Sequence, residues 1–105
     1  MVYGLPQQSI DGIREVFEGC EKIEKAWLYG SRALGNFKPG SDIDLTLIGD
    51  SLTLTDLLHL ENELDDLLLP YKIDLSLFQF IDNPDLIDHI RQVGVVFYDR
   101  QVPEA

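Results

Sequence analysis

The chain of 105 residues contains few of the residues on which many simple functional classes depend. It has one cysteine, Cys20, so no disulfide can form within it, and a reducing compartment is its simplest setting. Its two histidines, His59 and His89, stand far apart and have no cysteine beside them, which argues against a zinc site. Neither histidine has a sequence neighbour that would make it catalytic.

Basic residues are also scarce. Eight lysines and arginines stand against nineteen aspartates and glutamates, giving a formal net charge of -11. Proteins that bind nucleic acids usually need a basic face, so we expect no direct binding to DNA or RNA. The acidic excess has two explanations that the sequence leaves open: it keeps the chain soluble, or it meets a basic protein partner.

Long apolar runs are missing as well. No stretch approaches the ~20 residues that a membrane helix needs. Residues 1–8 lack both the basic start and the apolar run of a signal peptide. We therefore expect a cytoplasmic protein with no membrane association. The length predicts a single domain over residues 1–105, and a 45% hydrophobic content allows a modest core.

Apolar periodicity predicts that helices and strands alternate along the chain. The expected helices cover residues 6–19, 53 or 55 to about 69, and 83–93, and one helical turn is expected at 31–34. The expected strands cover residues 26–29, 42–48, 72–78 and 95–98. The leucines expected to be buried along the second helix are Leu57, Leu60, Leu64, Leu67 and Leu68. This order predicts an α/β (α+β) fold in which helices cover mainly one face of a small mixed sheet.

Three aspartates form the first candidate site. Asp42 and Asp44 are two residues apart on a predicted strand, so their side chains share a face. Two carboxylates held so close repel each other, and one tends to take up a proton. Mg²⁺ relieves that repulsion and is commonly held by one or two carboxylates plus substrate phosphates. Asp74 repeats the pattern on another predicted strand; if the strands are neighbours, it can hold a second metal or act as general base.

A second candidate site lies directly before the first. The predicted strand 26–29 ends at Gly30, and Ser31 begins a helical turn. Backbone N–H groups at such a start bind anions, and glycine lets a phosphate approach closely. Ser31 adds a hydroxyl, and Arg32 adds a fork of donors. We therefore expect the β- and γ-phosphates of a nucleotide beside the metal.

Together these residues resemble a known family. Gly30-Ser31, ten intervening residues and Asp42-Ile43-Asp44 are similar to the defining motif of the DNA polymerase β-like nucleotidyltransferase superfamily. The runs 28–35 and 41–45 look like its minimal, single-domain (MNT) members, and the run 71–75 fits their third-carboxylate strand.

The resemblance implies a polymerase β-like fold, a Mg²⁺-dependent transfer of AMP from ATP, and a set of site residues. The residues expected to serve catalysis and to hold two Mg²⁺ ions are Asp42, Asp44 and Asp74. The residues expected to contact the nucleotide are Gly30, Ser31, Arg32 and Ser41. An acceptor hydroxyl would attack the α-phosphate, and pyrophosphate would leave.

The resemblance also implies a partner. Many minimal members act as antitoxins of HEPN-domain toxins, and some are believed to transfer AMP to a tyrosine of the toxin. Larger members carry an extra helical domain, which this sequence lacks, so we expect either that a partner completes the site in a hetero-oligomer or that the domain has little activity alone. Two alternatives stay open: a non-catalytic antitoxin that acts by complex formation alone, and a transferase for a small, aminoglycoside-like acceptor.

Overall fold

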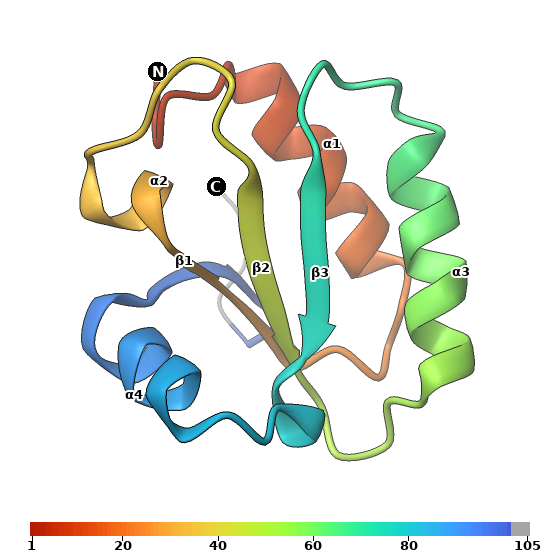
Figure 1. Ribbon diagram of the computed structural model, residues 1–105. Coiled ribbons are helices and arrows are strands. Elements are labelled where there is room, and N and C mark those ends of the chain that lie inside the picture. Colours follow the sequence, from red (N-terminus) through yellow and green to blue (C-terminus); the bar gives the residue numbers. More distant parts are fainter. Residues whose placement is uncertain (102–105) are drawn as a thin grey trace.

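The computed structural model describes residues 1–101. Its elements follow the predicted order, with a short 3-10 helix, η1, in addition (Figure 1). They are α1 (Gln7–Glu18), β1 (Lys25–Tyr29), α2 (Ser31–Leu34), β2 (Ile43–Ile48), α3 (Leu54–Asp65), β3 (Ile73–Leu77), η1 (Phe78–Phe80), α4 (Pro84–Val93) and β4 (Val95–Asp99). The predicted α/β fold is confirmed.

The four strands form one mixed sheet with the order β3-β2-β1-β4. β1 runs antiparallel to both of its neighbours, β2 and β4, whereas β2 and β3 run parallel. The carboxyl end of β1 therefore meets the amino ends of β2 and β3 at one edge of the sheet. The residues that precede and begin these two strands are the aspartates singled out from the sequence.

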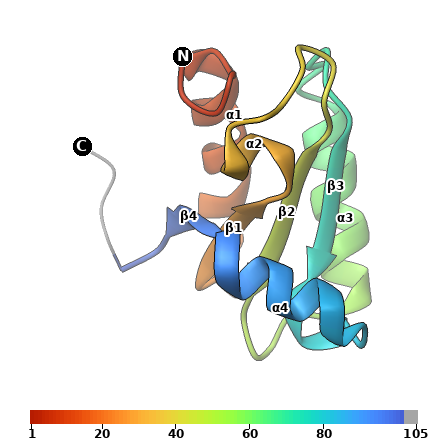
Figure 2. The same ribbon diagram turned by 60° about the vertical axis from the view of Figure 1, so that its left-hand side comes forward.

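The main hydrophobic core lies between the sheet and the helices α1 and α3. Strand alternation sends Leu28, Leu45 and Leu75 into this core, where all three are buried. Ile13 and Phe17 of α1 meet them, as the helical spacing predicts. Figure 2 shows α1 and α3 behind the sheet and α4 in front of it. The polar residues of the strands are therefore left on the face opposite the main core.

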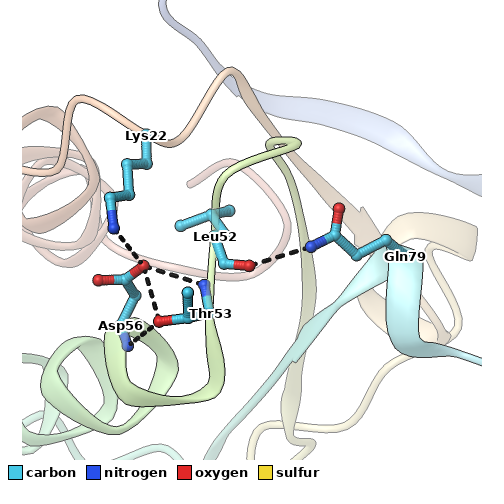
Figure 3. A network of polar contacts seen from close by, with 5 residues as sticks. All are labelled: Lys22, Leu52, Thr53, Asp56 and Gln79. Carbon is cyan, nitrogen blue, oxygen red and sulfur yellow. Dashed lines mark hydrogen bonds and ion pairs between the residues drawn. The ribbon is translucent and has the colours of Figure 1, made fainter.

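A capping box fixes the start of α3 (Figure 3). The Thr53 hydroxyl accepts a hydrogen bond from the Asp56 backbone N–H at 3.2 Å, and the Asp56 carboxylate accepts one from the Thr53 backbone N–H at 2.9 Å. Lys22, from the connection between α1 and β1, donates to the same carboxylate oxygen at 3.0 Å. The cap thus ties α3 to the segment that leads into β1.

The predicted end of the second helix is wrong by one turn. α3 ends at Asp65 because the next amide groups form tighter i to i-3 bonds, from Leu67 to Leu64 and from Leu68 to Asp65. Leu68 then adopts a positive φ of 54°. Its side chain is 88% exposed, so the prediction that Leu68 is buried is also wrong. The turn redirects the chain toward β3.

α4 packs on β1 from the face opposite α1 and α3. It begins where the Asn83 side chain accepts hydrogen bonds from the N–H groups of Asp85 and Leu86, and Pro84 occupies the first turn. Ile90 is its buried anchor. The third strand ends at Leu77, one residue earlier than predicted. Within residues 1–101 no helix is both long and apolar enough to cross a bilayer.

The cap of α3 predicts a dependence of stability on pH. The backbone hydrogen bond from Thr53, followed by the bond from Lys22, lowers the pKa of Asp56. A lowered folded-state pKa stabilises the fold above the unfolded value of about 4, and this contribution is lost as the pH falls through the folded pKa. We expect Asp56→Asn to unfold at a lower temperature than the wild type at pH 7.

Thermal unfolding followed by circular dichroism from pH 7 to about pH 2.5 measures this effect. The melting temperatures of Asp56→Asn and the wild type should converge at the acid end. Asp50→Asn removes the same charge from another exposed aspartate and serves as the control. A constant difference between Asp56→Asn and the wild type at every pH would contradict the role of the charge.

Candidate active site

The predicted aspartates meet at the edge where β1 ends and β2 and β3 begin. The register pairs Asp44 of β2 directly with Asp74 of β3 on one side and with Tyr29 of β1 on the other. Asp42 precedes β2 by one residue. β2 and β3 are therefore neighbours, and Asp74 can join the other two aspartates, as the sequence analysis required.

Like charge is concentrated at this edge. Burial raises the pKa of Asp44, and the carboxylates of Asp74 and Asp42 raise it further. Asp42 and Asp74 are exposed. Among the described residues, no lysine or arginine forms an ion pair with any of the three. The edge is thus an uncompensated acidic site that a cation would stabilise.

The three carboxylates do not form a finished metal cage. In residues 1–101, no group of three or more histidine, cysteine, aspartate or glutamate side chains is arranged to hold a metal ion. The oxygen donors nevertheless suit Mg²⁺, which keeps several ligands from water or phosphate. Burial and the neighbouring carboxylates raise the pKa of Asp44, and a bound cation would relieve the repulsion between these carboxylates.

Gly30 brings the predicted phosphate turn onto Asp44. Its φ of 75° and ψ of -156° lie in a region that side-chain-bearing residues rarely adopt. A Cβ atom at this position would collide with the Asp44 carboxylate oxygen Oδ2. Glycine therefore serves both the turn and the close approach. The Gly30-Ser31 peptide and the aspartate site lie against each other, although ten residues separate Ser31 from Asp42 in the sequence.

His89 also belongs to this site, which the sequence analysis missed. Its Nε2 atom accepts a hydrogen bond from the Gly30 backbone N–H at 3.2 Å. Its ring packs edge-on against Tyr29, with 6.1 Å between the ring centroids and an interplanar angle of 80°. No local signal could reveal this contact, because α4 begins more than fifty residues after Gly30.

Polar side chains continue along the sheet from the aspartates. The Ser76 hydroxyl of β3 donates to the Thr46 hydroxyl of β2 at 2.9 Å, and Thr46 is fully buried. Burial raises the pKa of the Tyr29 hydroxyl, and the carboxylates of Asp74 and Asp44 add to the rise. The Tyr29 hydroxyl therefore stays neutral and adds no further negative charge beside Asp44.

The side chain of Arg32 lies inside the fold. Its side chain is 2% exposed and stacks between the rings of Phe37 and Tyr71. The guanidinium donates to the Tyr3 carbonyl at 2.9 Å and to the Ser41 carbonyl at 2.8 Å. Arg32 therefore has a structural role, because its donors face backbone carbonyls inside the fold, and its contact with a nucleotide stays a prediction.

The guanidinium of Arg32 fixes the loop that joins α2 to β2. A further bond to the Pro39 carbonyl, at 3.3 Å, completes its hold on the loop. The Ser41 hydroxyl accepts a hydrogen bond from the Lys38 N–H at 2.8 Å and closes the turn before Asp42. Ser41 thus has a structural role here, and its contact with a nucleotide stays a prediction.

The family of this chain follows from a comparison with known proteins. The polymerase beta nucleotidyltransferase family matches residues 11–102, which is most of the sequence. The chain belongs to this family, as the Gly30-Ser31 and Asp42-Ile43-Asp44 motif predicted. No curated protein is similar enough to count as a match.

Solved structures of toxin–antitoxin complexes have the same fold. One, a toxin–antitoxin with AMP-PNP, matches with a TM-score of 0.69 and 21% identity over 92% of this chain and 76% of that chain. An MntA-HepT structure matches with a TM-score of 0.66 and 19% identity over 91% and 74%. A tri-AMPylated Shewanella oneidensis HEPN toxin in complex with an MNT antitoxin matches with a TM-score of 0.65 and 20% identity over 90% and 73%. At these identities the likeness establishes the fold.

The place of Arg32 predicts a large effect on stability. Arg32→Met keeps the apolar contacts with the two rings but leaves buried carbonyl groups without donors. We expect the free energy of unfolding to fall by about 3 kcal/mol, as for other buried groups that lose charged partners. Urea unfolding measures it. Arg91→Met, at an exposed site on α4, is the matched control and should stay close to the wild type. Equal stability of both variants would contradict the structural role of Arg32.

The raised pKa of Asp44 predicts that a substitution at this residue makes the fold more stable. Because the folded-state pKa is raised, the unfolded chain releases this proton first, and stability falls as the pH rises above about 4. Asp44→Asn removes the charge, so at pH 7 without divalent cations we expect this variant to be more stable than the wild type. The difference should shrink as the pH approaches 4. Urea unfolding at both pH values checks it, and a less stable Asp44→Asn at pH 7 would contradict the prediction.

Proposed function

We propose that this protein is a Mg²⁺-dependent nucleotidyltransferase that moves AMP from ATP to a protein hydroxyl. The proposed acceptor is a tyrosine of a partner HEPN toxin, so that the protein acts as its antitoxin. The observation that carries the proposal is the direct pairing of Asp44 with Asp74 beneath Gly30, with Asp42 at the same edge. Membership of the polymerase beta nucleotidyltransferase family supports the reaction class.

The proposed metal ligands are Asp42, Asp44 and Asp74. Their carboxylates offer the hard oxygen donors that Mg²⁺ prefers, and the triphosphate would supply further oxygens. Metal ligands that come partly from the protein and partly from the triphosphate agree with an acidic site that does not form a metal cage by itself. Bound Mg²⁺ supplies Lewis-acid stabilisation of charge on the reacting phosphate.

The chain's own residues would have separate tasks. The backbone and hydroxyl of Ser31, at the start of α2, would bind phosphate oxygens, and Gly30 leaves room for them. Asp74 is exposed and paired with Asp44, so it can reach an incoming hydroxyl. As the hydroxyl oxygen bonds to the α-phosphorus, its proton would pass to Asp74. The bond between the α-phosphorus and pyrophosphate breaks in the same displacement.

The partner follows from charge and from the structures that share the fold. The formal charge of -11 favours a basic protein surface as the one that meets this chain. Similar structures include MntA-HepT and an MNT antitoxin with a tri-AMPylated HEPN toxin. Both support a HEPN partner and a hetero-oligomer for the present chain. They also support ATP as the nucleotide, together with the structure that contains AMP-PNP.

A second function has a specific observation in its favour. The formal charge of -11 suits a basic protein surface whether or not AMP is transferred, which agrees with an antitoxin that acts by complex formation alone. The two functions differ in the effect of Asp44→Asn in cells that express the toxin. Protection that persists in this variant favours simple complex formation, whereas loss of protection with intact binding favours catalysis.

Transfer of label tests the proposed reaction directly. The protein is incubated with ATP labelled at the α-phosphate, Mg²⁺ and its HEPN partner. We expect labelled partner with the wild type, and at least about 100-fold less with the double variant Asp42→Asn/Asp44→Asn, because loss of metal stabilisation costs several kcal/mol in the transition state.

The matched control is Asp65→Asn/Asp66→Asn. It removes the same two charges from exposed positions at the end of α3, on the other side of the sheet from the site. This variant should label the partner at the wild-type rate. Labelling that is unchanged in Asp42→Asn/Asp44→Asn would exclude the aspartates from the reaction.

A further inference from the structure

The contact between His89 and Gly30 joins two distant segments at the most constrained point of the site. Gly30 has a positive φ and lies against the Asp44 carboxylate, so a residue with a side chain would not fit in its place. The Gly30 N–H is directed to His89 Nε2 at 3.2 Å. An imidazole on α4 therefore holds the backbone donor that precedes Ser31.

The helix that carries the imidazole, α4, is itself held in place by its cap and by its packing on β1. Asn83 caps α4, Ile90 is buried beside His89 in the sequence, and the helix packs on β1. The edge-on contact with Tyr29 restricts the ring from a second side. The ring is partly buried, in contrast to His59, which is exposed on α3. A side chain held in this way can define the position of a peptide.

The direction of the hydrogen bond decides which nitrogen is free. Because Nε2 accepts from Gly30, it carries no proton, and the neutral ring carries its proton on Nδ1. Nε2 is thus not available to bind a phosphate while this bond exists. The Gly30 N–H is likewise occupied. Among the described residues, the donors that the first turn of α2 offers to a ligand include the Ser31 backbone N–H and the Ser31 hydroxyl.

We propose that His89 is a positioning residue that holds the Gly30-Ser31 turn against Asp44, and so sets Ser31 for the nucleotide. The effect on nucleotide binding rests on the proposed function, whereas the hold of His89 on Gly30 does not. His89 itself does not contact the phosphates. It acts through its hydrogen bond to the Gly30 peptide.

Two substitutions separate positioning from a direct role. His89→Gln places an amide oxygen near the position of Nε2, so it can still accept the Gly30 N–H bond. His89→Ala cannot. His59→Ala removes the other histidine, which is exposed and remote from the site, and is the matched control. Retained dispersion of the amide NMR spectrum verifies that each variant is folded.

The first measurement is hydrogen exchange of the Gly30 amide, followed by NMR without nucleotide. We expect exchange to be faster in His89→Ala and restored toward the wild-type rate in His89→Gln. The second is the dissociation constant for ATP with Mg²⁺. Loss of one hydrogen bond that orders the turn should raise it about fivefold in His89→Ala, while His89→Gln stays within about twofold of the wild type.

Each contrary outcome has its own meaning. Unchanged Gly30 exchange in His89→Ala would overturn the proposal. So would a His89→Gln variant that restores Gly30 exchange but binds ATP as weakly as His89→Ala, because the imidazole would then act on the nucleotide itself. A wild-type protein that binds no ATP would contradict the proposed function, whereas the exchange pattern would still support the hold of His89 on Gly30.

Discussion

The parallel pairing of β2 with β3 is the constraint on which the site depends. It puts Asp44 directly beside Asp74, and strand alternation turns Asp42 to the same edge. Sheet hydrogen bonds thus hold like charges together, and burial, followed by the neighbouring carboxylates, raises the pKa of Asp44. A fold needs compensation for such an arrangement, and a cation with a bound triphosphate would provide it. We therefore expect the like charges at this edge to lower the stability of the fold when no cation is bound.

The rest of the fold keeps this edge in place. α1 and α3 bury the apolar face of the sheet, which leaves the polar face for the site. On that face, α4 supplies His89 to the Gly30 peptide. The buried side chain of Arg32, a residue of α2, fixes the loop that leads to Asp42. The turn, the loop and the strands are thus each fixed by contacts from a different element.

The local features of the site could be predicted from sequence, because strand alternation and the glycine-serine turn depend on neighbouring residues. The pairing of Asp74 with Asp44 needed the strand order, which the family resemblance implied. The direction of the Arg32 side chain could not be predicted, because burial against rings far along the chain decides it. The contact of His89 is equally non-local. Leu68 follows the helical stripe, but the turn that leads to β3 overrides that pattern.

Binding of Mn²⁺ together with a non-hydrolysable ATP analogue tests the central claim, because this paramagnetic ion broadens the NMR signals of nearby amides. If the acidic edge is the metal and nucleotide site, broadening should be strongest at Ser31, Asp44 and Asp74. It should be absent along the outer face of α3, for example at Leu58, and lost throughout in Asp44→Asn. Broadening that is centred elsewhere, or that persists unchanged in Asp44→Asn, would contradict the assignment of this edge as the active site.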